Sequence, residues 1–239
     1  MAAPLLNTKL NIPQLRPGFV SRPRLIEQLD KGLHRKLILI SAPAGFGKTT
    51  LLCQWIAETQ LPTGWLSLDE EDNDFTRFLS YLIAALQNLH PGIDQTALAL
   101  LHTPQAQSTK GVLTVLLNQL EEIPFDFLLV LDDYHLIEDQ TIHQAMDFLL
   151  SYLPPQMHLG IISRADPPLH FARLRAQGQV LEVRMSDLRF DQAECAQFIS
   201  GMLDTNISKT DLVKLQNRTE GWVSGLQMVA MTLRGRENV

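Results

Sequence analysis

The segment Ala42–Thr50, with the sequence APAGFGKTT, restricts the possible folds of this chain more than any other feature. It follows the apolar run LILIS, which predicts a short buried strand, and it precedes LLCQWIAETQ, which predicts a helix. Gly45 and Gly47 allow successive backbone N–H groups to face one point at the start of that helix, where an anion is favoured. The strand, the glycine-rich turn and the helix are therefore expected to form a phosphate-binding loop.

The spacing in this loop matches the pattern Gly-x4-Gly-Lys-Ser/Thr, except that Ala42 replaces the first glycine. In such a loop the lysine, here Lys48, reaches the β- and γ-phosphates of a nucleotide, and the hydroxyl of Thr49 ligates Mg²⁺. The alternative is an ordinary glycine-rich turn, which the flanking strand and helix disfavour. The predicted nucleotide contacts in the loop are Pro43, Ala44, Gly45, Phe46, Gly47, Lys48, Thr49 and Thr50.

A pair of carboxylates ends the most apolar stretch of the sequence, FLLVLDD at 127–133, which predicts a second buried strand. Asp132 is expected to act on the magnesium ion together with Thr49, as a Walker B aspartate does. Asp133 is a candidate to orient and deprotonate the attacking water. The alternative is an acidic pair that only begins the next turn of the chain, and for Asp133 the residues favour neither interpretation.

A third charged residue, Arg164, ends the predicted strand HLGIISR at 158–164. Its guanidinium could contact the γ-phosphate and thereby distinguish ATP from ADP. A surface salt bridge with Asp166 explains the same residues equally well, so both interpretations stay open. His135 and His143 lack the spacing of metal ligands, and we expect them to be structural or to lie at the surface.

The remaining strands and helices specify the fold class. Apolar runs at 65–68 and 180–185 add two strands, and amphipathic helices separate the strands along the chain. This alternation predicts an α/β fold with three layers and a mainly parallel sheet. Asp74 is the expected N-cap of the helix that follows the strand at 65–68. From Ser186 onward only helices are indicated, and the first of them has Asp191 as its expected N-cap with Glu194 as capping-box partner. We therefore expect a nucleotide-binding domain with an N-terminal arm at 1–186 and a small all-α domain at 187–239.

Composition and charge exclude several classes of protein. The 20 Lys and Arg residues against 26 Asp and Glu give a net charge of −6, which does not suit a surface that neutralises nucleic-acid phosphates. Two cysteines, Cys53 and Cys195, exclude a disulfide framework and fit a reducing cytoplasm. We find no signal-peptide pattern and no apolar run near the ~20 residues that span a bilayer. A soluble cytoplasmic protein without a membrane segment is expected.

Several segments occur in an order that resembles a known family. They are APAGFGKTTLL, WLSLDEEDNDFTRFLSYLIAAL, LLVLDDYHLI, IISRADPPLHFARLRAQG, the LRF segment at 188–190 and TEGWVSGLQMVAMTL. Together they resemble the N-terminal region of the MalT-like, LuxR-type bacterial transcription regulators, which are signal-transduction ATPases with numerous domains (STAND) and P-loop NTPases. The resemblance implies a five-stranded sheet of the ASCE type. In that sheet the strand before Arg164 lies between the strand of the loop and the strand of the aspartates, and Arg164 lies over the γ-phosphate.

The resemblance also implies a position for adenine. Family members hold the base between a segment before the first helix, here Phe19-Val20-Ser21-Arg22, and a motif in the helical domain, here Gly221-Trp222 with Gly225-Leu226. Val20, Arg22 and Trp222 are the candidate contacts. Many members have Gly-x-Pro in the second motif, whereas this sequence has Gly225-Leu226-Gln227, which leaves the adenine contact from that side open.

For function, the resemblance implies a switch that is operated by ATP or ADP with Mg²⁺. ADP would hold a closed monomer, ATP would favour self-association of the full-length protein, and slow hydrolysis would reset the switch. The inducer and DNA would bind through domains outside this chain. The alternatives are an AAA+-like motor or remodelling ATPase, which needs basic channel segments, and a small-molecule kinase, which needs an arginine-rich lid such as Arg173 and Arg175 could supply.

Overall fold

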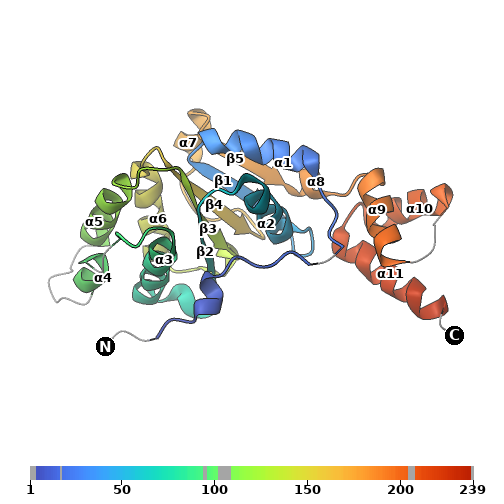
Figure 1. Cartoon of the computed structure of the whole chain (residues 1–239), viewed down its shortest axis with the longest axis horizontal. Helices are drawn as coiled ribbons and strands as arrows, with labels where there is room; N and C mark the ends of the chain where they lie inside the picture. The colour runs from blue at the N-terminus through green and yellow to red at the C-terminus, as the bar shows by residue number, and fades with distance from the viewer. Residues whose placement is uncertain (1–3, 17, 94–95, 102–108, 204–207, 238–239) are drawn as a thin grey trace.

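Five parallel strands form one sheet in the part of the chain that the computed structural model describes, residues 4–16, 18–93, 96–101, 109–203 and 208–237 (Figure 1). The strands are β1 (Leu37–Ser41), β2 (Thr63–Ser67), β3 (Phe127–Asp132), β4 (Met157–Ser163) and β5 (Val180–Arg184). Their order in the sheet is β2-β3-β4-β1-β5, and each neighbouring pair is parallel. Strand β4 lies between β1 and β3, which confirms the predicted three-layer P-loop NTPase sheet and its implied strand order.

Helices connect the strands and continue beyond the last of them. They are α1 (Pro23–Asp30), α2 (Lys48–Thr59), α3 (Phe75–Leu89), α4 (Thr96–Leu101), α5 (Thr109–Glu121), α6 (Gln140–Tyr152), α7 (Ala172–Ala176), α8 (Met185–Leu188), α9 (Gln192–Met202), α10 (Lys209–Thr219) and α11 (Val223–Glu237), with 3-10 helices η1 (Asn7–Leu10), η2 (Lys31–His34), η3 (Glu70–Asn73) and η4 (Tyr134–Leu136). The short helices α4 and α8 were not predicted, because neither is long enough to show a helical period. Within the described ranges, no helix combines the length and the apolar composition needed to cross a bilayer.

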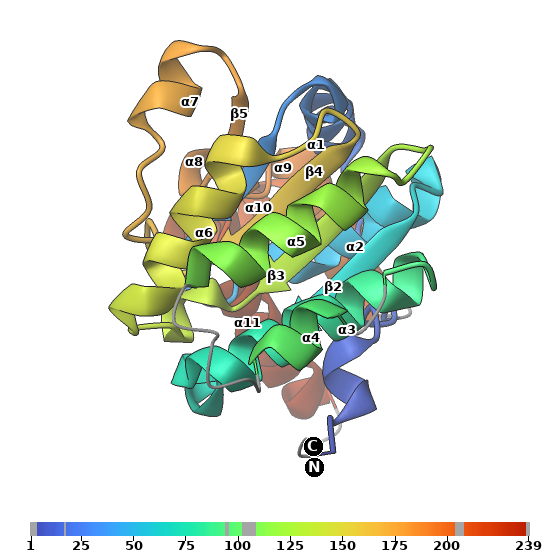
Figure 2. The same ribbon diagram turned by 90° about the vertical axis from the view of Figure 1, so that its left-hand side faces the viewer.

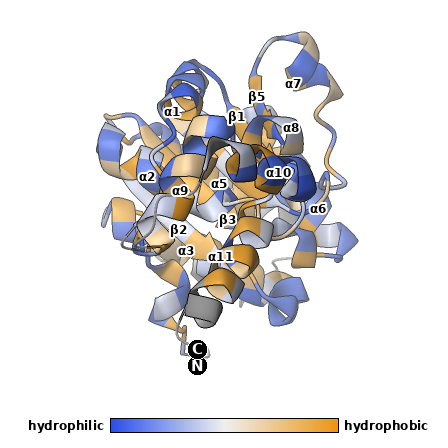
Figure 3. Ribbon diagram, turned by 90° about the vertical axis from the view of Figure 1, so that its right-hand side faces the viewer, coloured by the Kyte–Doolittle hydropathy of each residue, from blue (hydrophilic) through white to orange (hydrophobic). Residues whose placement is uncertain are grey.

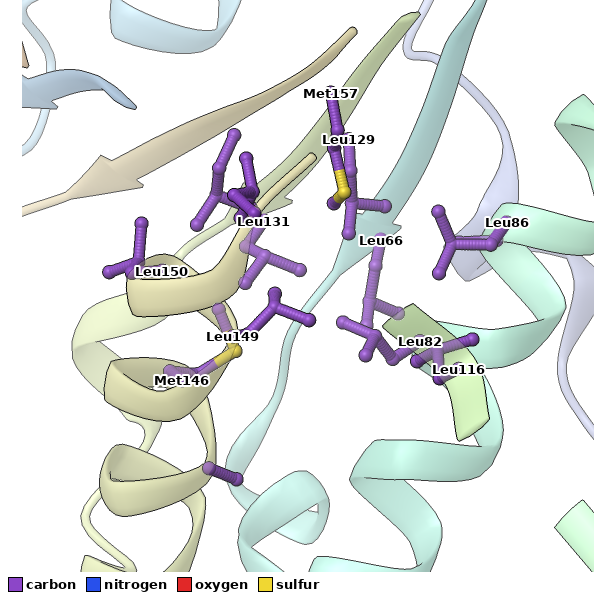
Figure 4. Packing of buried hydrophobic residues seen from close by; sticks show 14 of the residues in the cluster. Leu66, Leu82, Leu86, Leu116, Leu129, Leu131, Met146, Leu149, Leu150 and Met157 are labelled. Atoms are coloured by element: carbon purple, nitrogen blue, oxygen red, sulfur yellow. The ribbon is translucent and has the colours of Figure 1, made fainter. Parts of the chain in front are cut away.

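Both faces of the sheet are covered, so the strands are apolar throughout rather than alternating. Every residue of β1, β3 and β4 is buried. On one face, helices α3, α5 and α6 pack against the strands, and Figure 2 shows this layer in front of the sheet. In Figure 4, Leu86 of α3, Leu116 of α5 and Leu149 of α6 converge on Leu66 and Leu129. Helices α1 and α2 cover the opposite face.

Side-chain caps define the starts of two helices where the sequence placed them. The Asp74 carboxylate accepts a hydrogen bond from the Arg77 N–H at 2.8 Å, at the start of α3. At the start of α9, Asp191 accepts from the Glu194 N–H at 2.8 Å, and Glu194 accepts from the Asp191 N–H at 2.9 Å. This reciprocal pair is a capping box, which satisfies two backbone donors that the helix itself cannot. Both predicted N-caps are confirmed.

Helices α9, α10 and α11 lie together at one end of the molecule and have a hydrophobic core of their own (Figures 1 and 3). Phe190, Cys195, Ile199 and Leu226 form this core, and Val20 of the N-terminal arm joins it. The two clusters on the faces of the sheet are separate from it. This change of core supports our proposal of a domain boundary near residue 186. We call residues 190–233 the helical segment.

A buried salt bridge joins the N-terminal arm to the helical segment. Arg22 is only 4% exposed, and its Nε and Nη2 atoms each lie 3.1 Å from a carboxylate oxygen of Glu194. The Arg22 Nη1 atom also donates to the Leu188 carbonyl at 2.8 Å. A buried charge that loses its partner is costly, because the remaining ion has neither water nor a counterion around it. The pair therefore holds the two parts of the chain in one arrangement.

We predict that Arg22→Met lowers the free energy of unfolding by about 3–5 kcal/mol, because it leaves the Glu194 carboxylate buried without its main partner. Arg24→Met is the matched control. Arg24 is 44% exposed and lies 3.6 Å from the same carboxylate, so its loss should cost less than about 1 kcal/mol. Urea denaturation of both variants measures the difference. Equal losses would show that burial of the Arg22–Glu194 pair does not determine its contribution.

Candidate nucleotide-binding site

The loop between β1 and α2 has the backbone conformation of an anion-binding turn. Gly45 and Gly47 have φ angles of 81° and 75°, in the left-handed region that glycine enters without the steric cost of a Cβ atom. Gly47 is also the N-cap of α2, so the loop opens directly onto a helix N-terminus. Ala42, in place of the first glycine of the pattern, is not among the residues with positive φ. Its substitution for glycine is therefore compatible with the loop.

Lys48 lies in this loop and forms no salt bridge with a carboxylate of the described residues. Its Nζ atom donates to the carbonyl oxygens of Ala42 at 2.7 Å and Pro43 at 2.9 Å. Burial lowers the pKa of the Lys48 ammonium, as does the positive charge of Arg164, while Asp133 and Asp132 act in the opposite direction. An anionic ligand at this point would offset that loss of hydration. The side chain thus has the position and the charge for phosphate.

Thr49 and Asp132 face each other across the loop. The Thr49 hydroxyl donates to the Asp132 carboxylate, with oxygen–oxygen distances of 3.3 and 3.1 Å to Oδ1 and Oδ2. Burial, together with the charge of neighbouring Asp133, raises the pKa of Asp132 to about 6, although the hydrogen bond from Thr49 acts in the opposite direction. A hydroxyl and a carboxylate are the oxygen ligands that Mg²⁺ prefers. These two side chains fit a magnesium ion that is bound together with nucleotide phosphates.

Asp133 and Arg164 line the same cavity as the loop. This phosphate cavity has a volume of about 240 Å³ and is lined by Ala44, Gly45, Gly47, Lys48, Thr49, Thr50, Asp133 and Arg164. Asp133 has a φ angle of 57°, a conformation that costs free energy for a residue other than glycine. The cavity thus brings the predicted lysine, threonine, aspartate and arginine together, although they come from three separate strand ends.

The structure separates the two interpretations of Arg164. Asp166 forms its salt bridge with Arg184, through both carboxylate oxygens, and lies 3.7 Å from Arg175. Arg164 forms no hydrogen bond or salt bridge with any residue that the structure describes. The surface pair with Asp166 is therefore not formed. An exposed guanidinium without a partner lies instead at the wall of the phosphate cavity.

His135 is a residue of this site that the sequence interpretation missed. Its Nδ1 atom lies 3.8 Å from the Asp133 Oδ1, and both ring nitrogens are buried without a hydrogen-bond partner among the described residues. Burial lowers the pKa of His135, and the charges of Arg164 and Lys48 lower it further. Its position two residues after Asp133 was the available signal. His143, in contrast, is the structural histidine that was expected, since its ring contacts the Tyr134 hydroxyl at 3.1 Å.

A larger cavity continues from the loop toward the helical segment. We call it the base cavity. It has a volume of about 540 Å³, and its walls come from the N-terminal arm, the loop, α2 and the helical segment. It shares Gly45, Gly47, Thr49 and Thr50 with the phosphate cavity. The lining residues include Gln14, Phe19, Val20, Arg22, Phe190, Phe198, Met202 and Gln227. Two joined cavities of this kind fit a phosphate chain and an attached base.

The three candidates that the resemblance supplied have different positions. Val20 and Arg22 line the base cavity, but the Arg22 guanidinium is taken up by Glu194 and by backbone carbonyls. Trp222 lines neither of the two cavities, and its indole N–H donates to the Ala44 carbonyl at 3.0 Å. Of these three residues, Val20 is therefore the one that lines the base cavity without a polar group engaged elsewhere.

The chain is similar to known proteins in sequence and in fold. The chain is 39% identical, over 230 residues, to the HTH-type transcriptional regulator MalT of Yersinia pestis, with 96% of this chain and 25% of the relative covered. The MalT of Yersinia enterocolitica matches to the same extent. The chain thus spans about a quarter of the length of these relatives. No protein-family model matches the chain.

Among solved structures, a STAND protein with a tetratricopeptide repeat sensor from Pyrococcus horikoshii superimposes with a TM-score of 0.65. The two are 18% identical, and the match covers 95% of this chain and 32% of the other. The chain is therefore MalT-like in sequence and a P-loop NTPase in fold. Cdc6p from Pyrobaculum aerophilum has a related fold, with a TM-score of 0.52, 14% identity and coverage of 82% and 53% of the two chains.

Because the Asp132 carboxyl is buried, we expect the free energy of unfolding to depend on pH. The pKa of Asp132 is about 6 in the folded protein and ordinarily 3.8. Between pH 3.8 and pH 6 the Asp132 carboxyl is therefore protonated in the folded state but mostly ionised in the unfolded state. The free energy of unfolding therefore falls as the pH rises from 4 to 6, and at pH 7.5 the ionised Asp132 lowers it by about 3 kcal/mol. Asp132→Asn keeps an acceptor for Thr49 and removes the charge.

We expect Asp132→Asn to raise the free energy of unfolding by about 1–3 kcal/mol at pH 7.5 without nucleotide, and by less as the pH falls toward 4. Urea denaturation at several pH values measures this gain. Asp126→Asn, at an exposed aspartate just before β3, is the control and should give no gain. A gain of equal size at pH 4 and pH 7.5 would contradict the assigned pKa.

Proposed function

We propose that this region is the ATP/ADP-binding switch module of a bacterial signal-transducing transcription activator. The observation that carries the proposal is the unpaired guanidinium of Arg164 in the same cavity as Lys48 and the phosphate-binding loop. A site that only had to bind nucleotide would need the loop and the lysine. A cation that lines the same cavity adds a group with which the third phosphate of ATP would form a charge-assisted contact that ADP lacks.

In this proposal the loop holds the phosphates and the base cavity holds adenine. Residues 43–50 of the loop and of the start of α2 surround the phosphate chain, with Lys48 at the β- and γ-phosphates. Thr49 and Asp132 hold Mg²⁺, which supplies electrostatic stabilisation of the phosphate charge when it is bound. Val20 lines the base cavity, and Arg22 stabilises the wall of that cavity through its salt bridge with Glu194. Trp222 contacts the loop through its hydrogen bond to the Ala44 carbonyl. These assignments account for each nucleotide-contacting residue that the sequence suggested.

Hydrolysis in the proposed module is slow. Asp133 accepts a hydrogen bond from the attacking water and takes its proton, and Lys48 and Arg164 stabilise the developing charge on the phosphoryl group. His135 packs beside Asp133, with its Nδ1 atom 3.8 Å from the Asp133 Oδ1, and burial lowers the pKa of its ring. The positive φ of Asp133 is consistent with a side chain that is held in position for a reaction.

The switch requires two conformations of the protein. The ratio of the affinities for these two conformations must differ between ATP and ADP. A ligand that binds both states equally shifts no population. The contact between Arg164 and the γ-phosphate supplies that difference, and hydrolysis removes it. We infer that ATP favours self-association of the full-length protein in the cytoplasm, and that an inducer and DNA bind elsewhere in it. The name of the relatives, HTH-type transcriptional regulator, supports only the DNA-binding part of this inference.

The two alternative functions have less support. A kinase lid would bring Arg173 and Arg175 to the phosphates, but neither lines the phosphate cavity, and Arg175 is paired with Glu182 at 2.5 Å. A motor that moves nucleic acid needs a basic surface, whereas this chain has a net charge of −6. The fold shared with Cdc6p does not separate a motor from a switch, because similar folds carry many activities.

We predict that Arg164→Ala lowers the affinity for a non-hydrolysable ATP analogue about 10- to 150-fold, because the charge-assisted contact with the γ-phosphate is worth about 1.5–3 kcal/mol. Its affinity for ADP should change less than about 2-fold. Isothermal titration calorimetry with both ligands measures the two values. Arg173→Ala, at an exposed arginine outside the phosphate cavity, is the control and should leave both affinities unchanged. An equal loss for ATP and ADP in Arg164→Ala would overturn the switch proposal.

A second prediction divides the roles of the two aspartates. Asp133→Asn should slow hydrolysis about 10²- to 10⁴-fold, the usual contribution of a general base, while ATP affinity stays nearly intact. Asp132→Asn should weaken the binding of ATP in the presence of Mg²⁺ and have little effect without it. Single-turnover hydrolysis and titrations with and without Mg²⁺ test both variants. If both substitutions weaken magnesium-dependent binding equally, the division is wrong.

A further inference from the structure

The start of α11 contacts the phosphate-binding loop at two consecutive carbonyl groups. The Trp222 indole N–H donates to the Ala44 oxygen at 3.0 Å, and the Ser224 backbone N–H donates to the Gly45 oxygen at 3.1 Å. The Ser224 hydroxyl lies 3.3 Å from that same Gly45 oxygen. The helical segment therefore holds two peptide groups in the middle of the loop, although 178 residues separate Ala44 from Trp222 in sequence.

Fixing these carbonyl groups also fixes two N–H groups. In a trans peptide the C=O and the following N–H point in opposite directions, and the described residues contain no cis peptide bond. When the oxygens of Ala44 and Gly45 face α11, the N–H groups of Gly45 and Phe46 face away from it. Neither N–H has a hydrogen-bond partner among the described residues. Two oriented donors thus remain available for an anion in the loop.

The approach of α11 is so close that it requires glycine at position 45. A Cβ atom on Gly45 would lie 2.4 Å from the Ser224 Oγ and 2.7 Å from the Trp222 Nε1. A Cβ atom on Gly47, which has a similar φ angle, would have nothing within 4 Å. The two glycines therefore have different roles. Gly47 serves the backbone conformation, and Gly45 serves both that conformation and the contact with α11.

We infer that Trp222 and Ser224 are positioning residues of the phosphate site. They act through the loop, by holding the N–H groups of Gly45 and Phe46 toward the phosphates. Ser224 also lines the base cavity, whereas Trp222 does not. This inference rests on the proposed nucleotide function and extends it, because it makes the helical segment part of the phosphate site. Since coupling between two events is reciprocal, phosphate binding also strengthens the contact of α11 with the loop.

The first test uses Trp222→Phe, which keeps an aromatic ring, removes the indole donor and makes the side chain smaller; Trp55→Phe makes the same change in size. We expect its affinity for magnesium pyrophosphate to be about 2- to 12-fold weaker than that of the unmodified protein, the effect of losing one neutral hydrogen bond. Its affinity for adenosine should stay the same, because Trp222 does not line the base cavity. Competition titrations against a fluorescent ADP analogue give both values.

Trp55→Phe is the matched control, because the Trp55 indole N–H donates to Asp30 at 2.8 Å and Trp55 lines neither cavity. Its pyrophosphate affinity should be unchanged. The inference fails if Trp222→Phe binds pyrophosphate as well as the unmodified protein does, or if it loses affinity for adenosine instead. If the unmodified protein binds neither pyrophosphate nor ADP, the proposed function fails, and that result is distinct from the first.

The second test compares Gly45→Ala with Gly47→Ala, without nucleotide. Both substitutions place Ala at positive φ and carry similar backbone strain, but only the first puts a Cβ atom against α11. Hydrogen exchange of the amides at the start of α11 should become at least several-fold faster in Gly45→Ala and stay unchanged in Gly47→Ala. Equal exchange rates at the start of α11 in the two variants would overturn the inference.

Discussion

The parallel pairing of β1 with β4 determines the position of every charged group in the site. The two strands are in register to their ends, where Ser41 is opposite Ser163, and the ladder continues with a hydrogen bond from the Ala42 N–H to the Ser163 oxygen at 3.3 Å. The loop therefore leaves β1 beside the point where Arg164 leaves β4. Strand β3 pairs with the other side of β4 and delivers Asp132 and Asp133 to the same edge. Parallel strands with short connections bring such residues together, because their carboxyl ends share one side of the sheet.

The same arrangement confines opposing charges in a poorly hydrated space. Burial raises the pKa of Asp132 and lowers that of Lys48, so both groups are less stable as ions than they would be in water. Neither is paired with the other: Lys48 contacts carbonyl oxygens and Asp132 contacts a hydroxyl. A polyphosphate with a divalent cation supplies the complementary charge to each. Part of the proposed affinity for nucleotide would therefore come from relieving a cost that the folded protein carries without it.

The elements that the sequence predicted correctly are those that depend on short stretches of chain. The loop, the strand before Asp132 and the caps Asp74 and Asp191 each rest on neighbouring residues, and the structure has them as expected. The alternatives for Arg164 stayed open because its separation from Asp166 is compatible with a salt bridge, and only the sheet shows that Arg184 takes that carboxylate. The preference of Arg22 for Glu194 was likewise not predictable, since 172 residues separate the two.

The walls of the base cavity come from three parts of the chain, which are the N-terminal arm, the loop with α2, and the helical segment. The arm contributes Val20 to the core of the helical segment and Ser21 to a hydrogen bond with Gln54 of α2, at 2.9 Å. The buried salt bridge of Arg22 and the contact of Trp222 with the loop complete the connection. A ligand in this cavity touches all three walls, so it stabilises their common arrangement by an amount that increases with its concentration relative to its dissociation constant. In the proposed module, base and phosphates would therefore act on the same interface from two sides, and the contacts of Trp222 and Ser224 with the loop carbonyls would link the phosphate site to the helical segment.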